Sequence, residues 1–302
     1  MLVDSYGREI TNLRISVTQR CNLNCFYCHR EGEQKAVGEM SAGEISRICS
    51  IASKLGIKKL KITGGEPLMR DDIVDIISKC SNYFEEISMT TNGTLLACLA
   101  PRLKRAGLSR VNVSLDTLNR SVYRKITGQD LLSEVLDGIG KSIEAGLTPV
   151  KINTVVMKGI NEMEIDELMK YSKSVGAILQ LIELETQKER VNERFFKDYY
   201  CSLEPIEKRL ESIALKIVAR DLHKRKKYYL PEEVEIVRPM HNTAFCAHCH
   251  RLRITSDGYL KPCLLREDGN VDLISALRRN SSDDELINLF KIAVAKREPY
   301  WR

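Results

Sequence analysis

Between residue 12 and about residue 185, apolar and polar residues alternate between two patterns, one typical of strands and one typical of helices. Short runs rich in β-branched residues predict strands, and the stretches between them have apolar residues at the i, i+3 and i+4 spacing of an amphipathic helix. The predicted strands cover residues 13–17, 59–63, 86–91, 110–115, 150–156 and 178–184. Such alternation predicts an α/β fold with a parallel sheet and right-handed crossovers. The pattern alone fits an open sheet or a barrel.

The helix between the first two predicted strands has its own start and stop signals. Apolar residues at helical spacing cover residues 44–55. Ser41 and Glu44 have the spacing of a capping box, in which each side chain bonds a free amide of the first turn. Gly56 is suited to end the helix because it tolerates a positive φ.

The regular alternation of predicted strands and helices ends at about residue 186. A charged stretch at 188–197 precedes a predicted helix at 202–214, and the residues beyond suggest a small antiparallel unit. Asp257-Gly258 between two extended runs predicts a hairpin. We therefore predict two domains, residues 1–220 and residues 221–302, the second being a small α+β extension. The basic run at 223–227 is interpreted as a solvated edge of that extension.

The length, net charge and apolar content of the chain limit the classes of function that we expect. The chain has 302 residues and a formal net charge of +6, with no apolar run near the roughly 18 residues needed to span a bilayer. Its first residues lack the basic-then-apolar order of a secretory signal, which predicts a cytoplasmic protein. The charge suits a phosphate-bearing small molecule. Because no basic stripe is interleaved with aromatic residues, we predict neither a nucleic-acid nor a membrane partner.

Six of the ten cysteines fall into two groups of three. The groups are Cys21, Cys25 and Cys28, after the first predicted strand, and Cys246, Cys249 and Cys263. A [4Fe–4S] cube held by only three cysteines keeps one iron free to bind something else. The first group could alternatively be half of a zinc site or an electron-transfer cluster. The second could be a zinc knuckle completed by a histidine, although zinc usually takes paired CxxC or CxxC…HxxxH ligands.

Two further motifs lie where chemistry is expected. Gly64 and Gly65 directly follow the second predicted strand, and adjacent glycines let a backbone turn sharply and approach a ligand closely, although a plain turn would also explain them. Arg251 and Arg253 alternate along an extended segment and would point the same way. Two guanidinium groups presented together suit phosphate recognition.

These motifs together carry a family resemblance. The segment from Leu13 to Cys28 resembles the cluster loop of radical S-adenosylmethionine (SAM) enzymes. The CxxC-x₁₃-C spacing at residues 246–263, with residues 114–128 and 155–165, is similar to the GTP 3′,8-cyclase family of that superfamily. The resemblance covers nearly the whole chain. It implies an incomplete (β/α)₆ TIM-like barrel, in which functional groups gather at the strand C-termini.

The resemblance also implies cofactors and site residues. It implies two [4Fe–4S] clusters, one on each cysteine group, and SAM. The implied SAM contacts are Tyr27, Gly65 and Ser114. The implied substrate contacts are Arg14, Lys61, Thr91, Lys151, Arg251, Leu252 and Arg253. Lys61 stands where the bacterial pattern usually has Arg, so a point charge replaces a guanidinium fork there.

The implied activity is conversion of GTP to 3′,8-cyclo-7,8-dihydro-GTP, the first step of molybdenum cofactor biosynthesis. In the family, SAM cleavage yields a radical that takes the 3′ hydrogen of GTP, and the ribosyl radical then attacks purine C8. The protein positions the reactants rather than supplying an acid–base pair. Implied partners are a ferredoxin- or flavodoxin-like electron donor and a downstream pterin synthase. A homodimer, as in relatives, is an alternative to a monomer.

The chain departs from the family pattern at three places. Gln180 stands where the bacterial enzymes have Arg, and Glu185 stands where they have a SAM-contacting Met. The family often ends in Gly-Gly, whereas this chain ends in residues 299–302, Pro-Tyr-Trp-Arg. Two other functions stay open from the residues alone. One is a radical SAM peptide-modifying enzyme, which usually carries more C-terminal cysteines, and the other is a zinc-containing nucleic-acid-binding module.

Overall fold

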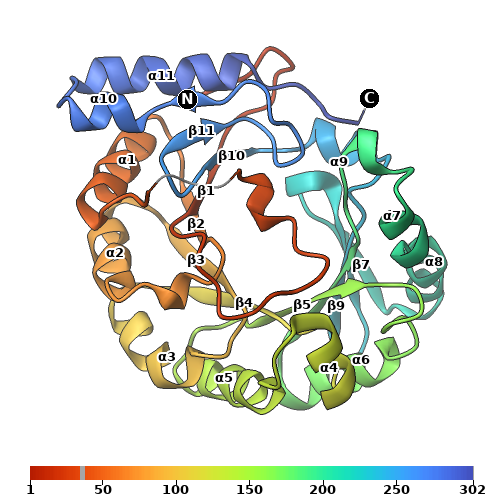
Figure 1. The fold of residues 1–302 in the computed structure, drawn as a ribbon. Coiled ribbons are helices and arrows are strands. Elements are labelled where there is room, and N and C mark those ends of the chain that lie inside the picture. The colour runs from red at the N-terminus through yellow and green to blue at the C-terminus, as the bar shows by residue number, and fades with distance from the viewer. Residues whose placement is uncertain (35–37, 302) are drawn as a thin grey trace.

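The computed structural model describes residues 1–34 and 38–301. Within these residues the named strands form one twelve-stranded sheet that curves around a central opening, with helices along its outer side (Figure 1). The strands are β1 (Asn12–Ser16), β2 (Lys59–Thr63), β3 (Glu86–Thr91), β4 (Arg110–Ser114), β5 (Lys151–Val156), β6 (Ile178–Glu183), β7 (Lys216–Ala219), β8 (Lys226–Tyr229), β9 (Glu233–Val237), β10 (Arg251–Ile254), β11 (Tyr259–Lys261) and β12 (Val271–Asp272). The α-helices are α1 (Ala42–Lys54), α2 (Ile73–Cys80), α3 (Leu96–Arg105), α4 (Arg120–Thr127), α5 (Leu132–Glu144), α6 (Ile165–Val175), α7 (Arg194–Tyr199), α8 (Glu204–Ile213), α9 (Thr243–Ala247), α10 (Ile274–Arg278) and α11 (Asp283–Ala295).

The α/β fold and the predicted strands are confirmed. Each predicted strand is present as β1 to β6, with ends within one residue of the prediction, and neighbours pair in parallel in chain order. The capping box at the start of α1 is also confirmed, because the Ser41 side chain accepts from the Glu44 amide and Glu44 accepts from the Ser41 amide. Gly56 follows the end of α1 with φ +87°, a conformation that glycine adopts without strain.

The C-terminal strands join the main sheet. β10 pairs in parallel with β1, and β9 pairs in parallel with β6. The expected hairpin at Asp257-Gly258 is present between β10 and β11, and β8 pairs antiparallel with both β7 and β9. The predicted antiparallel unit is therefore not a separate body, since its strands extend both edges of the parallel sheet. β7 and β8 pair across the predicted boundary at residue 220, so that boundary stays a prediction.

The inner face of the sheet is polar. On β1, Leu13 and Ile15 are fully buried in the hydrophobic core, while Arg14 between them lines the opposite side, as the period of two along a strand requires. The strand register then places Arg253, Arg14 and Lys61 side by side on β10, β1 and β2. Cross-strand pairing therefore builds a continuous cationic row from residues far apart in sequence.

None of the helices in the described part of the chain is long and apolar enough to cross a lipid bilayer.

Candidate functional site

The inner face of the sheet borders a cavity of about 870 Å³. All the residues that were predicted to bind metal, cofactor or substrate line it, with the exception of Leu252. Those that line it are Arg14, Cys21, Cys25, Tyr27, Cys28, Lys61, Gly65, Thr91, Ser114, Lys151, Cys246, Cys249, Arg251, Arg253 and Cys263. Residues spread over the whole chain thus meet around one space.

Leu252 lies elsewhere. Its side chain is fully buried in the hydrophobic core, on the opposite face of β10 from Arg251 and Arg253. A contact between this residue and a bound substrate would therefore have to come from its backbone.

The first cysteine group lies on the loop between β1 and α1. Gly64 and Gly65 hold this loop against the end of β2, because the Gly65 amide donates to the Thr18 carbonyl over 2.7 Å. A Cβ on Gly64 would lie 2.5 Å from that same carbonyl oxygen, and one on Gly65 would lie 2.6 Å from the Gln19 carbonyl oxygen. The two glycines are therefore needed where the cysteine loop crosses β2, a packing role in addition to the sharp turn and the ligand approach predicted from the sequence.

Amide groups and an aromatic anchor fix the thiols of this loop. The Leu23 amide lies 3.5 Å from the Cys21 sulfur, and the Arg30 amide lies 3.4 Å from the Cys28 sulfur. Each donates toward the sulfur, and such bonds favour the thiolate that binds metal. The Tyr27 hydroxyl donates to Asp116 over 2.6 Å, which ties the loop to the segment after β4.

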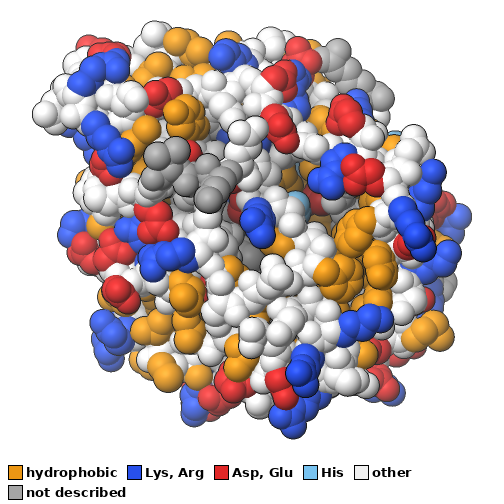
Figure 2. Space-filling view, in the orientation of Figure 1, with side chains coloured by type: hydrophobic (Ala, Val, Ile, Leu, Met, Phe, Trp, Pro, Cys, Tyr) orange, Lys and Arg blue, Asp and Glu red, His pale blue; other side chains and the backbone are white. Residues whose placement is uncertain are grey.

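Aromatic rings cover one side of the same loop. The rings of Phe26 and Tyr199 have centroids 5.2 Å apart, and Phe195 lies 6.1 Å from Phe26. Figure 2 shows a hydrophobic patch on this face of the molecule, next to α7. The loop is thus supported by packing as well as by hydrogen bonds.

A buried carboxylate organises the ends of β2 and β3. Glu66 is fully buried and accepts hydrogen bonds from the Thr91 hydroxyl at 2.7 Å and from the Asn92 amide at 2.6 Å. Burial raises the pKa of Glu66 to about 7. Thr91, predicted to contact substrate, is therefore already engaged on its hydroxyl by Glu66. Ser114, at the end of β4, is partly buried and lines the cavity.

The second cysteine group lies around α9 and after β11. Cys246 is in α9, and Cys249 follows it closely. The charges of Arg297 and Arg251 lower the pKa of the Cys249 thiol against the opposing effect of burial. The Arg297 guanidinium also donates to the Cys249 carbonyl over 2.8 Å, and Asp4 neutralises Arg297 at 2.6 Å. A buried charge network thus holds this segment in place.

Residues near the C-terminus also lie beside the second cysteine group. The Trp301 amide donates toward the Cys246 sulfur over 3.4 Å, and both Tyr300 and Trp301 line the cavity. The Trp301 ring contacts His241, with centroids 4.2 Å apart. Tyr300 and Trp301 therefore lie at the second cysteine group, while Arg302 lies outside the described residues.

A carboxylate that sequence reasoning missed bridges two predicted substrate contacts. Glu31, from the cysteine loop, pairs with Arg14 and lies 2.9 Å from Arg253. Although burial opposes it, the two guanidinium groups lower the pKa of Glu31 to about 2. The sequence holds no signal for this contact, because Glu31 is close to neither arginine along the chain.

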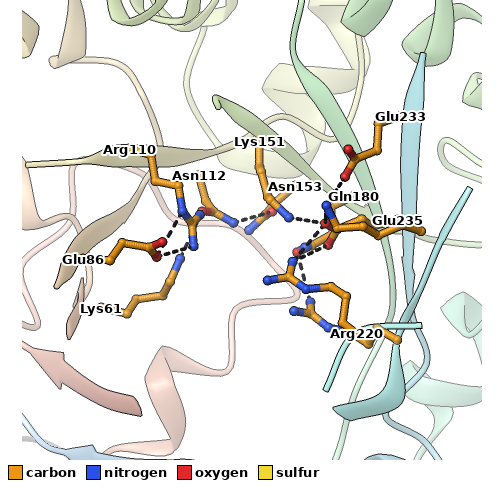
Figure 3. A network of polar contacts seen from close by, with 12 residues as sticks. Lys61, Glu86, Arg110, Asn112, Lys151, Asn153, Gln180, Arg220, Glu233 and Glu235 are labelled. Carbon is orange, nitrogen blue, oxygen red and sulfur yellow. Dashed lines mark hydrogen bonds and ion pairs between the residues drawn. The ribbon is translucent and has the colours of Figure 1, made fainter. Parts of the chain in front are cut away.

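Figure 3 shows the charged network on the inner face of the sheet. Lys61 donates to the Asn112 side chain at 3.0 Å. Lys151 on β5 is buried and pairs with the fully buried carboxylate of Glu235 on β9, which also accepts from Arg220 at 3.0 Å. These cations together with the surrounding arginines make the cavity wall strongly positive, which suits a highly charged anion.

The positions that depart from the family pattern lie in the cavity as well. Gln180 lines it and accepts a 3.4 Å hydrogen bond from Arg225. Glu185 also lines it, 3.6 Å from the His29 ring.

The prediction that residues 223–227 form a solvated edge holds only in part. The side chains of Lys224 and Lys226 are exposed, and β8 lies next to the edge strand β7. In contrast, His223 is buried, and Arg225 and Lys227 line the cavity.

The donor chemistry of the two cysteine groups fits iron–sulfur clusters. Each group offers three soft sulfur ligands to the cavity, and the first is reinforced by amides directed at the sulfurs. Among residues 1–34 and 38–301, no three His, Cys, Asp or Glu side chains are grouped as ligands of a single metal ion.

Two family models match the chain in succession. The Radical SAM superfamily matches residues 15–172, and Molybdenum Cofactor Synthesis C matches residues 177–302. Among curated relatives, the Pyrococcus abyssi protein named "Probable GTP 3′,8-cyclase" is 54% identical over all of both chains. The chain belongs to the GTP 3′,8-cyclase family of the radical SAM superfamily. A cyclase-family protein of the same name from Thermococcus kodakarensis is 50% identical, again over all of both chains.

Solved structures share the fold of this cyclase-family chain. SuiB of Streptococcus suis, bound to S-adenosylmethionine, matches with a TM-score of 0.63 at 17% identity, over 94% of this chain and 66% of that chain. The structure titled anSMEcpe with bound AdoMet matches with a TM-score of 0.54 at 19% identity, over 83% of this chain and 73% of that one. Both likenesses concern the radical SAM fold.

Proposed function

We propose that the chain converts GTP to 3′,8-cyclo-7,8-dihydro-GTP, the first step of molybdenum cofactor biosynthesis. One observation supports this most strongly: two three-cysteine groups and a row of cations line a single cavity. The full-length relatives named GTP 3′,8-cyclase favour this reaction over peptide modification and over a zinc-containing nucleic-acid-binding module.

The sheet is, in this proposal, the incomplete (β/α)₆ TIM-like barrel of radical SAM enzymes. The run from β1 to β6 supplies the six parallel strands, and the loops at their C-terminal ends carry the first cysteine group and the Gly64-Gly65 turn. Catalytic groups gather at this edge in related barrels. β9 and β10 extend the parallel run at its two sides.

The chain would hold two [4Fe–4S] clusters, each on three cysteines. Cys21, Cys25 and Cys28 would hold one, and Cys246, Cys249 and Cys263 the other. When bound, the first cluster and SAM supply the one-electron chemistry that opens the reaction. Tyr27, Gly65 and Ser114 would contact SAM.

The protein's own residues bind and orient the nucleotide. Arg14, Lys61, Lys151, Arg251 and Arg253 would hold the triphosphate by charge-assisted hydrogen bonds, roughly 1.5–3 kcal/mol each. Holding the ribose and the purine of one molecule in fixed geometry favours bond formation between C3′ and C8. The enclosing wall limits water around the reacting atoms.

The remaining roles follow from the same proposal. A ferredoxin- or flavodoxin-like donor would supply the electron, and a pterin synthase would take the product. A cytoplasmic location and a homodimer stay predictions.

The test is anaerobic reconstitution with iron and sulfide, followed by dithionite, SAM and GTP, with product analysis by mass spectrometry. Cyclised nucleotide is expected. The double variant Arg251→Ala, Arg253→Ala should lose GTP turnover while keeping SAM binding, because neither arginine is among the predicted SAM contacts. Formation of 5′-deoxyadenosine without cyclised nucleotide in the unaltered protein would point to another substrate. Normal GTP turnover by the double variant would refute the phosphate contacts.

A further inference from the structure

A hairpin places Arg225 over the inner face of the sheet. β7 and β8 pair antiparallel, and the Arg220 amide donates to the Arg225 carbonyl over 2.8 Å, which closes the hairpin. At its tip His223 stacks on Phe245, with ring centroids 3.8 Å apart, and the His223 amide donates to the His248 carbonyl. The tip is therefore fixed against the second cysteine segment, and Arg225 is held at the cavity wall.

Arg225 forms no ion pair within the described part of the chain, and the Glu235 carboxylate acts on its charge only from beyond ion-pair distance. Its guanidinium makes one side-chain hydrogen bond, at 3.4 Å, to the neutral Gln180 side chain. Its Nε is buried and has no hydrogen-bond partner. Arg220, on the same hairpin, differs because it pairs with the Glu235 carboxylate at 3.0 Å.

The nearby carboxylate is already shared. Glu235 pairs with Lys151 and Arg220, and Lys227 lies 3.7 Å from it. The single carboxylate of Glu235 therefore already has three cations within ion-pair distance, without counting Arg225. A partly buried cation that has no direct ion pair and shares its nearest carboxylate is expected to meet an anion that is not part of the protein. Although the Glu235 charge opposes it, burial lowers the pKa of Arg225 to about 10.

Lys61 is in a comparable state on the opposite side of the same wall. It lines the cavity, and its ammonium bonds the neutral Asn112 side chain. Within residues 1–34 and 38–301, no carboxylate lies within ion-pair distance of Lys61 or Arg225. Lys61 on β2 and Arg225 just before β8 thus line one cavity without a direct ion pair.

We propose that Arg225 is a further substrate-binding residue that contacts the triphosphate of GTP. This inference rests on the proposed function and deepens it, because no motif singled out Arg225. A polyphosphate supplies several oxygens and several negative charges, which is what a set of separated cations around one cavity requires. The carboxylate of SAM is the other anion expected there. GTP is favoured because the hairpin packs on Phe245 and His248 beside the second cysteine group, away from the loop that holds the first.

The experiment uses the full-length, cluster-reconstituted protein and equilibrium titrations under anaerobic conditions. GTP, GDP, guanosine and SAM are titrated separately into the unaltered protein and Arg225→Gln. The matched control is Lys224→Gln, which removes one positive charge from the preceding residue. The Lys224 side chain is solvent-exposed and lies near Asp221. Arg225→Lys keeps the positive charge and removes the planar, bidentate hydrogen-bonding geometry of the guanidinium group.

GTP binding by Arg225→Gln should be about ten- to a hundredfold weaker, as expected for one charged hydrogen-bonding group. GDP should be affected less, guanosine and SAM not at all, and Lys224→Gln should match the unaltered protein. Arg225→Lys should recover part of the affinity. The melting temperature of Arg225→Gln should stay equal or rise, because a partly buried charge without a direct ion pair has been removed.

Three results would overturn the assignment. Unchanged GTP affinity in Arg225→Gln refutes the Arg225 contact and leaves the proposed function intact. Weakened SAM binding instead of GTP binding shows that the SAM carboxylate is the anion. A lower melting temperature with equal loss of guanosine and GTP binding shows a structural role. If the unaltered protein binds GTP no better than guanosine, the proposed function fails as well.

Discussion

Replacing Glu235 by Gln tests whether the charged network of Figure 3 stabilises the fold. Glu235 is fully buried, pairs with Lys151, and lies 3.0 Å from Arg220. Glutamine keeps the shape and removes the charge, which leaves two cations without their counter-charge. Breaking a buried ion pair from one side costs roughly 3–5 kcal/mol.

The pKa of Glu235 gives a second measure of the same effect. Although burial opposes it, the surrounding cations lower this pKa from its ordinary value of 4.5 to about 2. At about 1.4 kcal/mol per pH unit, this corresponds to about 3 kcal/mol of folding free energy. Because the folded pKa is the lower one, the contribution is fully present above pH 4.5 and is lost as the pH falls toward 2.

Thermal and urea unfolding of the two proteins are the assays. At neutral pH, Glu235→Gln should unfold about 3 kcal/mol more easily, a drop of roughly 5 °C in the melting temperature. The difference should shrink as the pH is lowered from about 4.5 to about 2. GTP should stabilise the variant more than the unaltered protein, because bound phosphate restores negative charge near Lys151 and Arg220.

Glu233→Gln is the matched control on the same strand. Glu233 pairs with Lys227 at 2.6 Å near the edge of the network, and its side chain is 18% exposed. Its removal should cost less than about 1 kcal/mol. If Glu235→Gln were as stable as Glu233→Gln at neutral pH, the reasoning about the buried network would be refuted.

Two further substitutions test the cysteine loop. Glu31→Gln should free Arg14 and Arg253 from their carboxylate partner, so GTP measured by titration should bind severalfold more tightly. Weaker binding would mean that Glu31 holds these arginines in place for the ligand. Gly65→Ala would set a Cβ 2.6 Å from the Gln19 carbonyl oxygen, so the loop must shift and the iron content should fall by about half. Unchanged iron content would contradict the role given to Gly65.

Local sequence signals predicted the strands and the first helix well. The ends of β1 to β6 were correct within one residue because β-branched runs and helical spacing both act over a few residues. The capping box at Ser41 is likewise a local interaction and was confirmed. The two cysteine groups recognised from spacing both line the cavity, and their role as cluster ligands stays a prediction.

The sequence did not predict contacts between residues that are far apart along the chain. That β10 lies beside β1, and β9 beside β6, depends on contacts between residues more than 50 positions apart. The Glu31 carboxylate between Arg14 and Arg253 exists only because the loop crosses that row. The basic run at 223–227 was only partly predicted for the same reason, since composition does not reveal which of its side chains line the cavity.

We propose that each three-cysteine group holds one [4Fe–4S] cluster, and iron analysis of three proteins measures this. Anaerobically reconstituted unaltered protein should hold about eight irons per chain. Replacing Cys21, Cys25 and Cys28 together by Ala should leave about four, and so should replacing Cys246, Cys249 and Cys263. The account would be contradicted if either triple variant kept all its iron, or if the C-terminal group held zinc without acid-labile sulfide.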